Sequence, residues 1–346
     1  MNDQTGVSAP QQLPPEAQLM QLIGGSFVTQ AIYIGTKLGI ADLLADGPKN
    51  IADLAASTET DESSLYRLLR SLASLGIFSE NGDRSFSNTP TSDLLRVDSP
   101  KSLRAMMLFI GDEAHARVVN DMMYSVKTGK PAWDNVHGVA CFPYMFETNK
   151  ALGDVFNQAM TASSHVQAAA VLDAYDFSEI RTIADIAGGH GHLVGSIVKK
   201  YPSMNGVLFD MGTVLAGAPE LLASYGVADR IQMVEGDFFS DIPVVADAYI
   251  MKHIIHDWYD DNCEKILGCI RRSMPDSAKV LIVDTVIPPG NDPHPGKILD
   301  LEMLISPGGK ERTAKEFETL LNNSGFRMTR IVPTHSPVSI VEAVKA

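Results

Sequence analysis

Three glycines follow a short apolar segment in the middle of the chain and precede a helix-forming stretch. The segment "TIADIA" (182–187) predicts a buried strand, and Gly188, Gly189 and Gly191 come directly after it. Glycines at such a turn let the backbone approach a nucleotide closely. A dinucleotide fingerprint that begins at Gly189 requires a glycine at Val194, and no G-K-[ST] of a phosphate-binding loop is present here. The loop therefore indicates a nucleotide-like ligand without a pyrophosphate.

Carboxylates end the next two predicted strands. Asp210 closes "NGVLFD" (205–210), and Asp237 closes "IQMVEGD" (231–237). Because the carboxyl ends of parallel strands meet at one edge of a sheet, we expect Asp210 to accept both ribose hydroxyls of an adenosine. Asp237 would accept the adenine amine, and Phe238 would cover the ring. An isolated strand-end aspartate is equally consistent with a cap, but this order favours a cofactor site.

The cofactor that fits best is S-adenosylmethionine. It carries an adenosine and a methionine tail but no phosphate, and the glycine loop has no neighbouring lysine or arginine. A rim rich in carboxylates also suits the positive charge of its sulfonium.

These residues lie in a region of alternating strands and helices. From residue 176 onward, "TIADIA", "NGVLFD", "IQMVEGD", "DAYIMKHI" and "KVLIVDTVI" alternate with helical segments, which predicts an α/β domain with a mostly parallel sheet. The final "FRMTRIVPTHSPVSIVEAVK" predicts two strands, paired antiparallel at the sheet edge.

The first hundred residues have a different pattern. Residues 19–44 predict one helix, and residues 51–57 and 62–75 predict two more, the last opened by Asp61 as N-cap. The turn "ENGD" between "IF" and "RSFS" predicts a hairpin. This is a winged-helix pattern. Its second helix is largely apolar with only Arg67 and Arg70 as cations, which favours a dimerisation module over a DNA-binding one.

Composition narrows the function classes further. The chain has 346 residues, a net charge of −14 and 45% hydrophobic residues, so a large core is expected and broad binding to nucleic acid or anionic membranes is disfavoured. Cys141, Cys263 and Cys269 have no metal-binding spacing, which predicts a reduced, cytoplasmic protein. No apolar run suggests a membrane span or a signal peptide.

We expect four regions along the chain: a loose tail (1–16), a winged-helix dimerisation domain (17–100), a helical linker with a substrate pocket (101–175) and a cofactor-binding domain (176–346). Methionines and aromatic residues are dense in the third region. They predict the wall of a pocket for a flat apolar substrate, although a plain core is equally consistent.

Five segments carry a family resemblance: "DIAGGHG" (185–191), "VLFDM" (207–211), "EGDFF" (235–239), "MKHIIHDWYDDNCEKIL" (251–267) and "SPGGKERTAKEFETLL" (306–321). Over residues 17–346 the chain resembles the S-adenosylmethionine-dependent small-molecule O-methyltransferases of the plant caffeic-acid and hydroxyindole type, whose bacterial relatives methylate phenazines, anthracyclines and mitomycins. The resemblance implies a homodimer with an N-terminal, mostly α winged-helix domain and a Rossmann-like methyltransferase domain. Ala187 departs from the usual D-V-G-G-G pattern.

The resemblance also implies residue roles. His256 would be the general base, oriented by the carboxylate of Asp284 with that of Glu311 nearby; the aspartate at 284, where the family has glutamate, is one methylene shorter. Cofactor contacts are expected at Gly188, Gly189, Asp210, Met211, Asp237, Phe238 and Lys252. Substrate contacts are expected at Asn157, Met160, Asp257 and Met303.

The role expected of His256 follows from the weak acidity of a phenol. A phenol, with a pKa of about 10, is a poor nucleophile until its proton leaves, and a histidine can take that proton while a carboxylate balances the imidazolium. His253 and His256 could also be read as an i, i+3 metal pair, but the sequence places no third ligand, so no metal is expected. His190 and His192 receive no role.

Three functions remain open from the sequence. The first is a metal-independent O-methyltransferase acting on a hydroxylated aromatic secondary metabolite. The second is a winged-helix transcription regulator whose α/β half senses a ligand, and the third is an NADP-dependent oxidoreductase. His256 favours the first, because a sensor needs no base.

Overall fold

The computed structural model describes residues 13–346, and its contacts divide the chain into one compact unit that ends at Glu113 and another that begins at Ala114. Of the predicted tail, residues 1–12 lie outside the described residues, and helix α1 already begins at Pro15.

The first unit contains the predicted helix-turn-helix and hairpin. Its elements are α1 (Pro15–Ile23), α2 (Gly25–Lys37), α3 (Ile40–Leu43), β1 (Lys49–Asn50), α4 (Ile51–Thr58), α5 (Glu62–Ser74), β2 (Phe78–Asn81), η1 (Gly82–Arg84), β3 (Ser85–Asn88), η2 (Ser92–Leu95) and α6 (Arg104–Ile110). The three strands pair antiparallel in the order β1-β3-β2. The predicted N-cap is confirmed, since Asp61 accepts the Ser64 N–H at 2.8 Å.

The single helix predicted over residues 19–44 is wrong, because it is three helices. Gly24 separates α1 from α2, which begins at Gly25, and Gly39 adopts φ +68° between α2 and α3. Glycine lowers helix stability and readily enters the left-handed region, so it ends helices that the apolar period alone would continue.

The apolar residues of the first unit fall into a buried and an exposed set. Leu65, Leu69 and Leu72 of α5 are buried in the unit's own core, so the leucines of this helix do not supply the external surface that the sequence suggested. Exposed apolar side chains gather instead on α1 and the start of α2. Among them are Leu19, Met20, Leu22, Ile23 and Phe27, and Phe27 is 80% exposed.

The second unit begins with helices and continues into a sheet. The helical part comprises α7 (Glu113–Asn120), α8 (Met122–Thr128), α9 (Ala132–His137), α10 (Cys141–Pro143), η3 (Tyr144–Thr148) and α11 (Lys150–Ala174). The sheet part comprises β4 (Thr182–Ile186), α12 (His192–Lys200), β5 (Asn205–Asp210), α13 (Gly212–Leu215), α14 (Ala218–Tyr225), η4 (Ala228–Arg230), β6 (Ile231–Glu235), β7 (Ala248–Lys252), η5 (Ile255–Asp257), α15 (Asp260–Ser273), β8 (Lys279–Asp284), α16 (Gly296–Ile305), α17 (Ala314–Asn323), β9 (Phe326–Pro333) and β10 (Ser339–Lys345).

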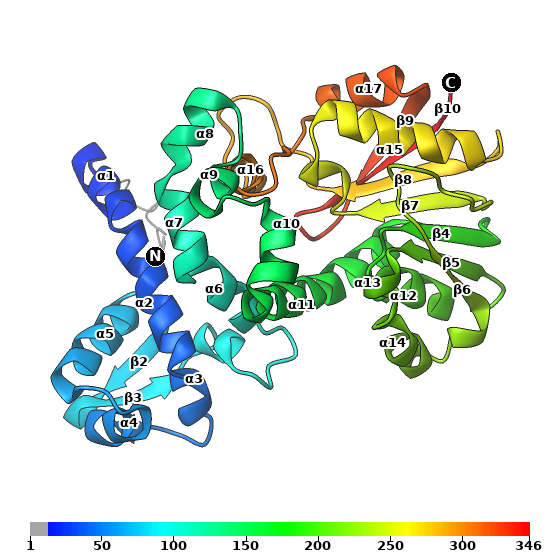
Figure 1. Cartoon of the computed structure of the whole chain (residues 1–346). Coiled ribbons are helices and arrows are strands. Elements are labelled where there is room, and N and C mark those ends of the chain that lie inside the picture. The colour runs from blue at the N-terminus through cyan, green and yellow to red at the C-terminus, as the bar shows by residue number, and fades with distance from the viewer. Residues whose placement is uncertain (1–12) are drawn as a thin grey trace, which may run out of the picture. The chain divides into compact units, whose positions relative to one another are not determined.

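The sheet of the second unit has the order β6-β5-β4-β7-β8-β10-β9. The pairs from β6 to β8 are parallel, and β10 pairs antiparallel with both β8 and β9. The predicted parallel sheet and the terminal antiparallel pair are therefore confirmed. Helices α15 and α17 lie over one face of the sheet and α12 and α14 over the other (Figure 1).

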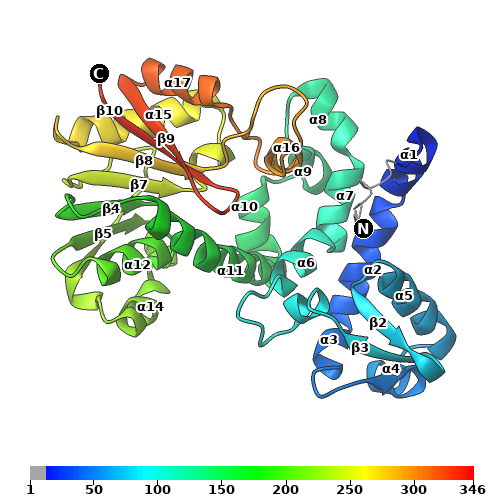
Figure 2. The same ribbon diagram turned by 180° about the vertical axis from the view of Figure 1, so that it is seen from behind.

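Alternation along each strand explains why both faces are covered. Within β4, Ile183 points to the α12 side, whereas Ala184 and Ile186 point to the α15 side. The strands are apolar on both faces because a parallel sheet is buried on both sides. Figure 2 shows the same layers from behind, with α11 running toward the sheet. Over residues 13–346, no helix is both long and apolar enough to cross a membrane.

Candidate active site

The strand order creates a switch point at the carboxyl edge of the sheet. The chain runs outward from β4 through β5 to β6, then returns so that β7 pairs with the other side of β4. Loops that leave neighbouring strands in opposite directions open a crevice at such a point, where α/β folds bind their ligands. The loop after β4 carries the three glycines, Lys252 ends β7, and the segment after β7 carries His253 and His256.

The glycine loop is shaped by its backbone. Ala187, Gly189 and Gly191 all have positive φ, at 55°, 62° and 81°. At Gly188 an added Cβ would lie 2.6 Å from both Asp185 and Leu208, so no side chain fits there. Ala187 adopts the left-handed conformation at the position where the sequence departs from the D-V-G-G-G pattern, at a cost of about 1 kcal/mol.

Asp210 holds this loop in place. Its Oδ2 accepts the Gly189 N–H at 2.8 Å, and its Oδ1 accepts the Met211 N–H at 2.7 Å. Burial raises the pKa of this carboxyl, and the two N–H donors act in the opposite direction. Asp210 therefore has a structural partner in the loop in addition to any ribose contact, which the sequence did not reveal.

The other predicted cofactor residues lie around the same edge. Met211 follows Asp210 and is 56% exposed. Asp237 is exposed at the end of β6, where it accepts the Phe239 N–H at 2.9 Å. Phe238 packs against Phe239, with the ring centroids 4.7 Å apart.

Lys252 ends β7. Burial lowers its pKa, while the charges of Asp185 and Asp284 act to raise it. The edge thus offers a glycine cradle, acidic side chains and one buried cation. This donor set fits S-adenosylmethionine, which has hydroxyls, an amine and a carboxylate to bind but no phosphate.

We predict that Asp210→Asn weakens binding of S-adenosylhomocysteine about tenfold or more, because a hydrogen bond to a charged acceptor contributes roughly 1.5–3 kcal/mol. Asparagine keeps one oxygen for the Gly189 N–H, so the loop is disturbed less than by alanine. Calorimetry measures the affinity, with Asp229→Asn as a matched control on the exposed turn η4. Equal affinities in both variants would contradict a ribose-binding role.

His256 is buried in the short helix η5, directly after β7. It is 7% exposed. Its Nδ1 lies 2.8 Å from Glu311 Oε1, and its Nε2 lies 3.4 Å from Asp257 Oδ1. Since Nδ1–H donates to the carboxylate of Glu311, the neutral ring keeps its lone pair on Nε2. Burial disfavours the imidazolium, but Asp257, Glu311 and Asp284 outweigh it and raise the pKa of His256 to about 9.

Glu311 reaches His256 because the segment 309–312 is fastened to the turn that carries the histidine. The Lys310 N–H donates to His256 O at 2.9 Å, and Arg312 Nη1 donates to Ile255 O at 2.9 Å. An added Cβ at Gly309 would lie 1.8 Å from His256 O, so only glycine allows this approach.

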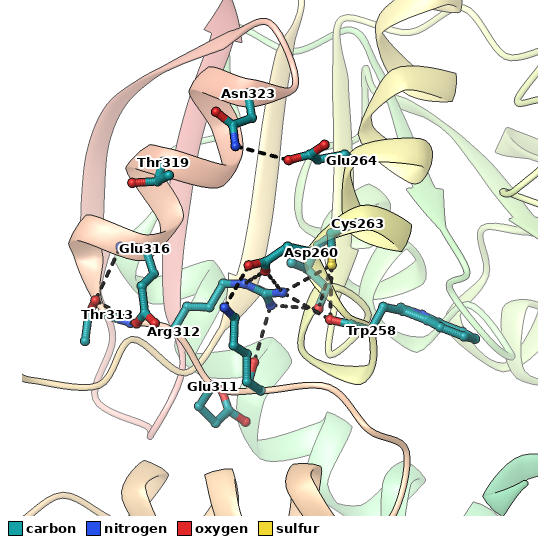
Figure 3. A network of polar contacts seen from close by, with 12 residues as sticks. Trp258, Asp260, Cys263, Glu264, Glu311, Arg312, Thr313, Glu316, Thr319 and Asn323 are labelled. Carbon is teal, nitrogen blue, oxygen red and sulfur yellow. Dashed lines mark hydrogen bonds and ion pairs between the residues drawn. The ribbon is translucent and has the colours of Figure 1, made fainter. Parts of the chain in front are cut away.

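Arg312 holds the segment 309–312 in place through its hydrogen bonds. It is 1% exposed, and its Nη2 lies 2.7 Å from Asp260 Oδ1 and 3.1 Å from Trp258 O (Figure 3). Thr313 and Glu316 form a capping box that begins α17 immediately afterwards (Figure 3). Arg312 was not among the residues predicted for the site, although its place beside the predicted catalytic glutamate in "GGKERT" could have indicated it.

The carboxylate expected to orient His256 from position 284 does not do so. Asp284 is fully buried, but neither of its oxygens has a hydrogen-bond partner among the described residues. Its nearest ring nitrogen is Nδ1 of His253, at 3.7 Å from Oδ1. The expectation that Asp284 is the main orienting group is therefore corrected in favour of Glu311. The physical reason is the short aspartate side chain.

The four residues predicted to contact the substrate differ in their burial and in their position relative to His256. Asp257 adjoins His256 and lies beside its Nε2. Asn157 is exposed on α11, Met160 is partly buried on the same helix, and Met303 is buried on α16. No contact ties these last three to His256, and their roles remain predictions. Helix α11 does reach the segment after β7, since Gln167 Oε1 lies 3.0 Å from His253 Nε2.

A class of protein follows from this combination of fold and site. A doubly wound sheet with a glycine cradle, acidic strand ends and no phosphate-binding cation is the arrangement of an S-adenosylmethionine-dependent methyltransferase. Residues 120–327 match the O-methyltransferase domain family, and residues 20–98 match the O-methyltransferase dimerisation domain family. The chain belongs to the O-methyltransferase family.

Named relatives cover nearly the whole chain. The phenazine O-methyltransferase PhzM of Lysobacter antibioticus is 43% identical over 96% of this chain and 96% of its own length. The 8-amino-8-demethylriboflavin N,N-dimethyltransferase of Streptomyces davaonensis is 36% identical over 91% of each chain.

Solved structures agree with the fold. The crystal structure of LaPhzM superposes with a TM-score of 0.90 at 42% identity and covers 96% of this chain and 100% of its own. Human N-acetylserotonin methyltransferase, solved with S-adenosylmethionine, superposes with a TM-score of 0.87 at 26% identity and covers 98% of this chain and 100% of its own. The chain is an S-adenosylmethionine-dependent methyltransferase.

Proposed function

We propose that this enzyme transfers a methyl group from S-adenosylmethionine to a hydroxyl of a small aromatic metabolite, with His256 as general base. The observation that carries the proposal is the contact of 2.8 Å between His256 Nδ1 and Glu311 Oε1. It fixes the tautomer in which Nε2 can accept a proton.

S-adenosylmethionine supplies an electrophilic methyl group on a sulfonium. His256 takes the acceptor's proton on Nε2, and Glu311 and Asp257 stabilise the imidazolium that forms. A pKa near 9 for His256 is close to the pKa of about 10 of a phenol, so the transfer is nearly balanced in energy. Alignment of the acceptor oxygen with the methyl group supplies much of the remaining acceleration.

We propose oxygen rather than nitrogen as the atom that accepts the methyl group because His256 is placed to act as a base. The relatives include both an O-methyltransferase and an N,N-dimethyltransferase, so family membership leaves the accepting atom open. A neutral aromatic amine already has a lone pair and loses its proton easily after methylation. A phenol benefits from a base before or during transfer, and a buried histidine held by a carboxylate provides one.

A methyl-transfer screen with labelled cofactor tests the proposal. Paired acceptors that share one aromatic ring system and carry either a hydroxyl or an amine at the same position are compared. Faster labelling of the hydroxyl partners, in a product whose mass fragments carry the label on oxygen, is the expected result. Labelling confined to the amines would overturn the O-methyltransferase proposal while leaving the enzyme class intact.

We further propose that the protein is a homodimer through its first unit. The match of residues 20–98 to a dimerisation domain and the exposed apolar side chains of α1 and α2 support this. Phe27, at 80% exposed, and Leu22, at 76%, are the most exposed of them.

We expect the full chain to be dimeric at micromolar concentration and Phe27→Glu to shift it toward the monomer, because a buried unpaired charge costs several kcal/mol at an interface. Light scattering measures the mass. Val245→Glu, at an apolar residue of the second unit that is 70% exposed, is the matched control. A wild-type monomer would contradict the proposal.

A further inference from the structure

The proposed base and two neighbouring side chains form a compact, largely buried group. His253, His256 and Asp284 each offer one ligand atom, and these atoms lie within 4.8 Å of one another. Asp284 is 0% exposed. Both of its oxygens and Nδ1 of His253 are buried without a hydrogen-bond partner among the described residues. The sequence suggested the two histidines as a pair and placed no third ligand, whereas the fold brings Asp284 from β8 beside them.

Two hydrogen-bond acceptors, Nδ1 of His253 and the carboxylate of Asp284, face one another inside this group. His253 Nε2 lies 3.0 Å from Gln167 Oε1, so Nε2 carries the hydrogen and donates it to the amide oxygen. Nδ1 is then left with a lone pair, and it points toward Asp284 Oδ1 at 3.7 Å. A lone pair and a carboxylate repel one another in a buried site, so a positive species is needed between them.

The surroundings of both histidines match those of metal ligands. A histidine bound to a metal usually donates its other ring N–H to a carbonyl or a carboxylate, which fixes the orientation of the ring. His253 has Gln167 Oε1 in this position, and His256 has Glu311 Oε1 bonded to its Nδ1. His253 also has φ +55°, a strained conformation for a residue with a side chain, and such strain is concentrated at functional sites.

The formal charges around the three side chains favour the binding of a divalent cation. Asp257, Asp284 and Glu311 supply three formal negative charges and Lys252 supplies one positive charge, and His256, whose pKa is raised to about 9, gives up its proton when the ion binds. Two nitrogens and one carboxylate are the donors that Zn²⁺ prefers, whereas Mg²⁺ and Ca²⁺ prefer oxygen alone. Three protein ligands leave a fourth position open, as in exchangeable zinc sites.

We propose that His253, His256 and Asp284 form a binding site for Zn²⁺, and that the bound ion inhibits methyl transfer. A histidine nitrogen that coordinates the ion cannot accept a proton from the acceptor. The inhibitory part rests on the proposed role of His256 as base, but binding of the ion does not.

Binding is tested on the full chain after treatment with a chelator. Zn²⁺ is titrated in competition with a chromophoric chelator, and Co²⁺ is added separately for its absorption spectrum. We expect one ion per chain with a Kd below about 1 µM and an intense visible Co²⁺ band of tetrahedral type. His253→Gln and Asp284→Asn should each weaken binding at least about tenfold, as loss of one ligand implies. His335→Gln, at an exposed histidine, should leave binding unchanged.

The outcomes separate the two claims. Absence of stoichiometric binding, equal binding in all variants, or a Co²⁺ spectrum like that of the hydrated ion would overturn the site and show that a proton alone occupies it. The wild-type Co²⁺ spectrum decides this even if a variant fails to fold. Stoichiometric Zn²⁺ binding with an unchanged methyl-transfer rate would overturn the inhibition. Failure of the base itself is detected independently by the metal-free activity of His256→Ala.

Discussion

Replacing His256 by alanine is expected to lower kcat by about 10²–10⁴-fold with a phenol acceptor, the usual contribution of a positioned base. The binding of S-adenosylhomocysteine should change little. His256 contacts Glu311 and Asp257, whereas the cofactor cradle is built around Gly188 and Asp210. Single-turnover kinetics measure the chemical step, and calorimetry measures the affinity.

A control distinguishes loss of the base from loss of the fold. His335→Ala removes an imidazole from an exposed position and should retain wild-type kcat. If His256→Ala binds S-adenosylhomocysteine as tightly as the wild type yet keeps its kcat, His256 is not the base.

Glu311→Gln is expected to lower kcat by about 10–150-fold, because a hydrogen bond to a charged partner contributes roughly 1.5–3 kcal/mol. It should also move the pH profile. Burial lowers the pKa of His256 and the neighbouring carboxylates raise it to about 9, so wild-type activity should rise with pH as the imidazolium loses its proton near that value. Removing one carboxylate destabilises the imidazolium, so the inflection should move to lower pH.

Asp284→Asn is the matched comparison, since it removes an equal charge without removing a hydrogen bond to His256. It should lower kcat less than Glu311→Gln and shift the inflection in the same direction. A larger loss of kcat in Asp284→Asn would restore Asp284 as the main orienting group. An unshifted inflection in Glu311→Gln would show that Glu311 does not stabilise the imidazolium.

The strands were predictable from sequence because their signals are local. An apolar run closed by an aspartate defines β5 and β8, an apolar run followed by glycines defines β4, and these glycines must form a turn whatever packs around them. The helix breaks near Gly24 and Gly39 were missed, since the apolar period continues across them and only the φ of Gly39 reveals the second break.

The contact between His256 and Glu311, proposed as base and orienting carboxylate, depends on more than local sequence signals. His256 and Glu311 are 55 residues apart, and the 2.8 Å contact depends on Gly309 and Arg312 fastening two loops together. Sequence resemblance pointed to both carboxylates, but the expectation that Asp284 is the one that orients His256 was wrong. That choice depends on whether an aspartate at the end of β8 reaches the imidazole, and here it is placed beside His253 instead.

The sequence pattern also could not predict which apolar side chains of the helices are exposed. The leucines of α5 and the large apolar residues of α1 look alike in the sequence. Leu65, Leu69 and Leu72 of α5 are nevertheless buried, whereas the large apolar side chains of α1, and Phe27 near the start of α2, are exposed. An apolar period identifies a face of a helix but does not say whether that face meets the protein's own core or a partner.

The rate of methyl transfer as a function of acceptor acidity tests the central claim most directly. Wild type and His256→Ala are compared, free of metal and with saturating cofactor, on phenols that share one ring system and differ in pKa. With weakly acidic phenols the wild type should be faster by about 10²–10⁴-fold, and the gap should close as the phenol becomes acidic enough to ionise unaided. Equal rates at every acceptor pKa would mean that positioning alone drives the reaction, and would contradict the assignment of His256 as the base.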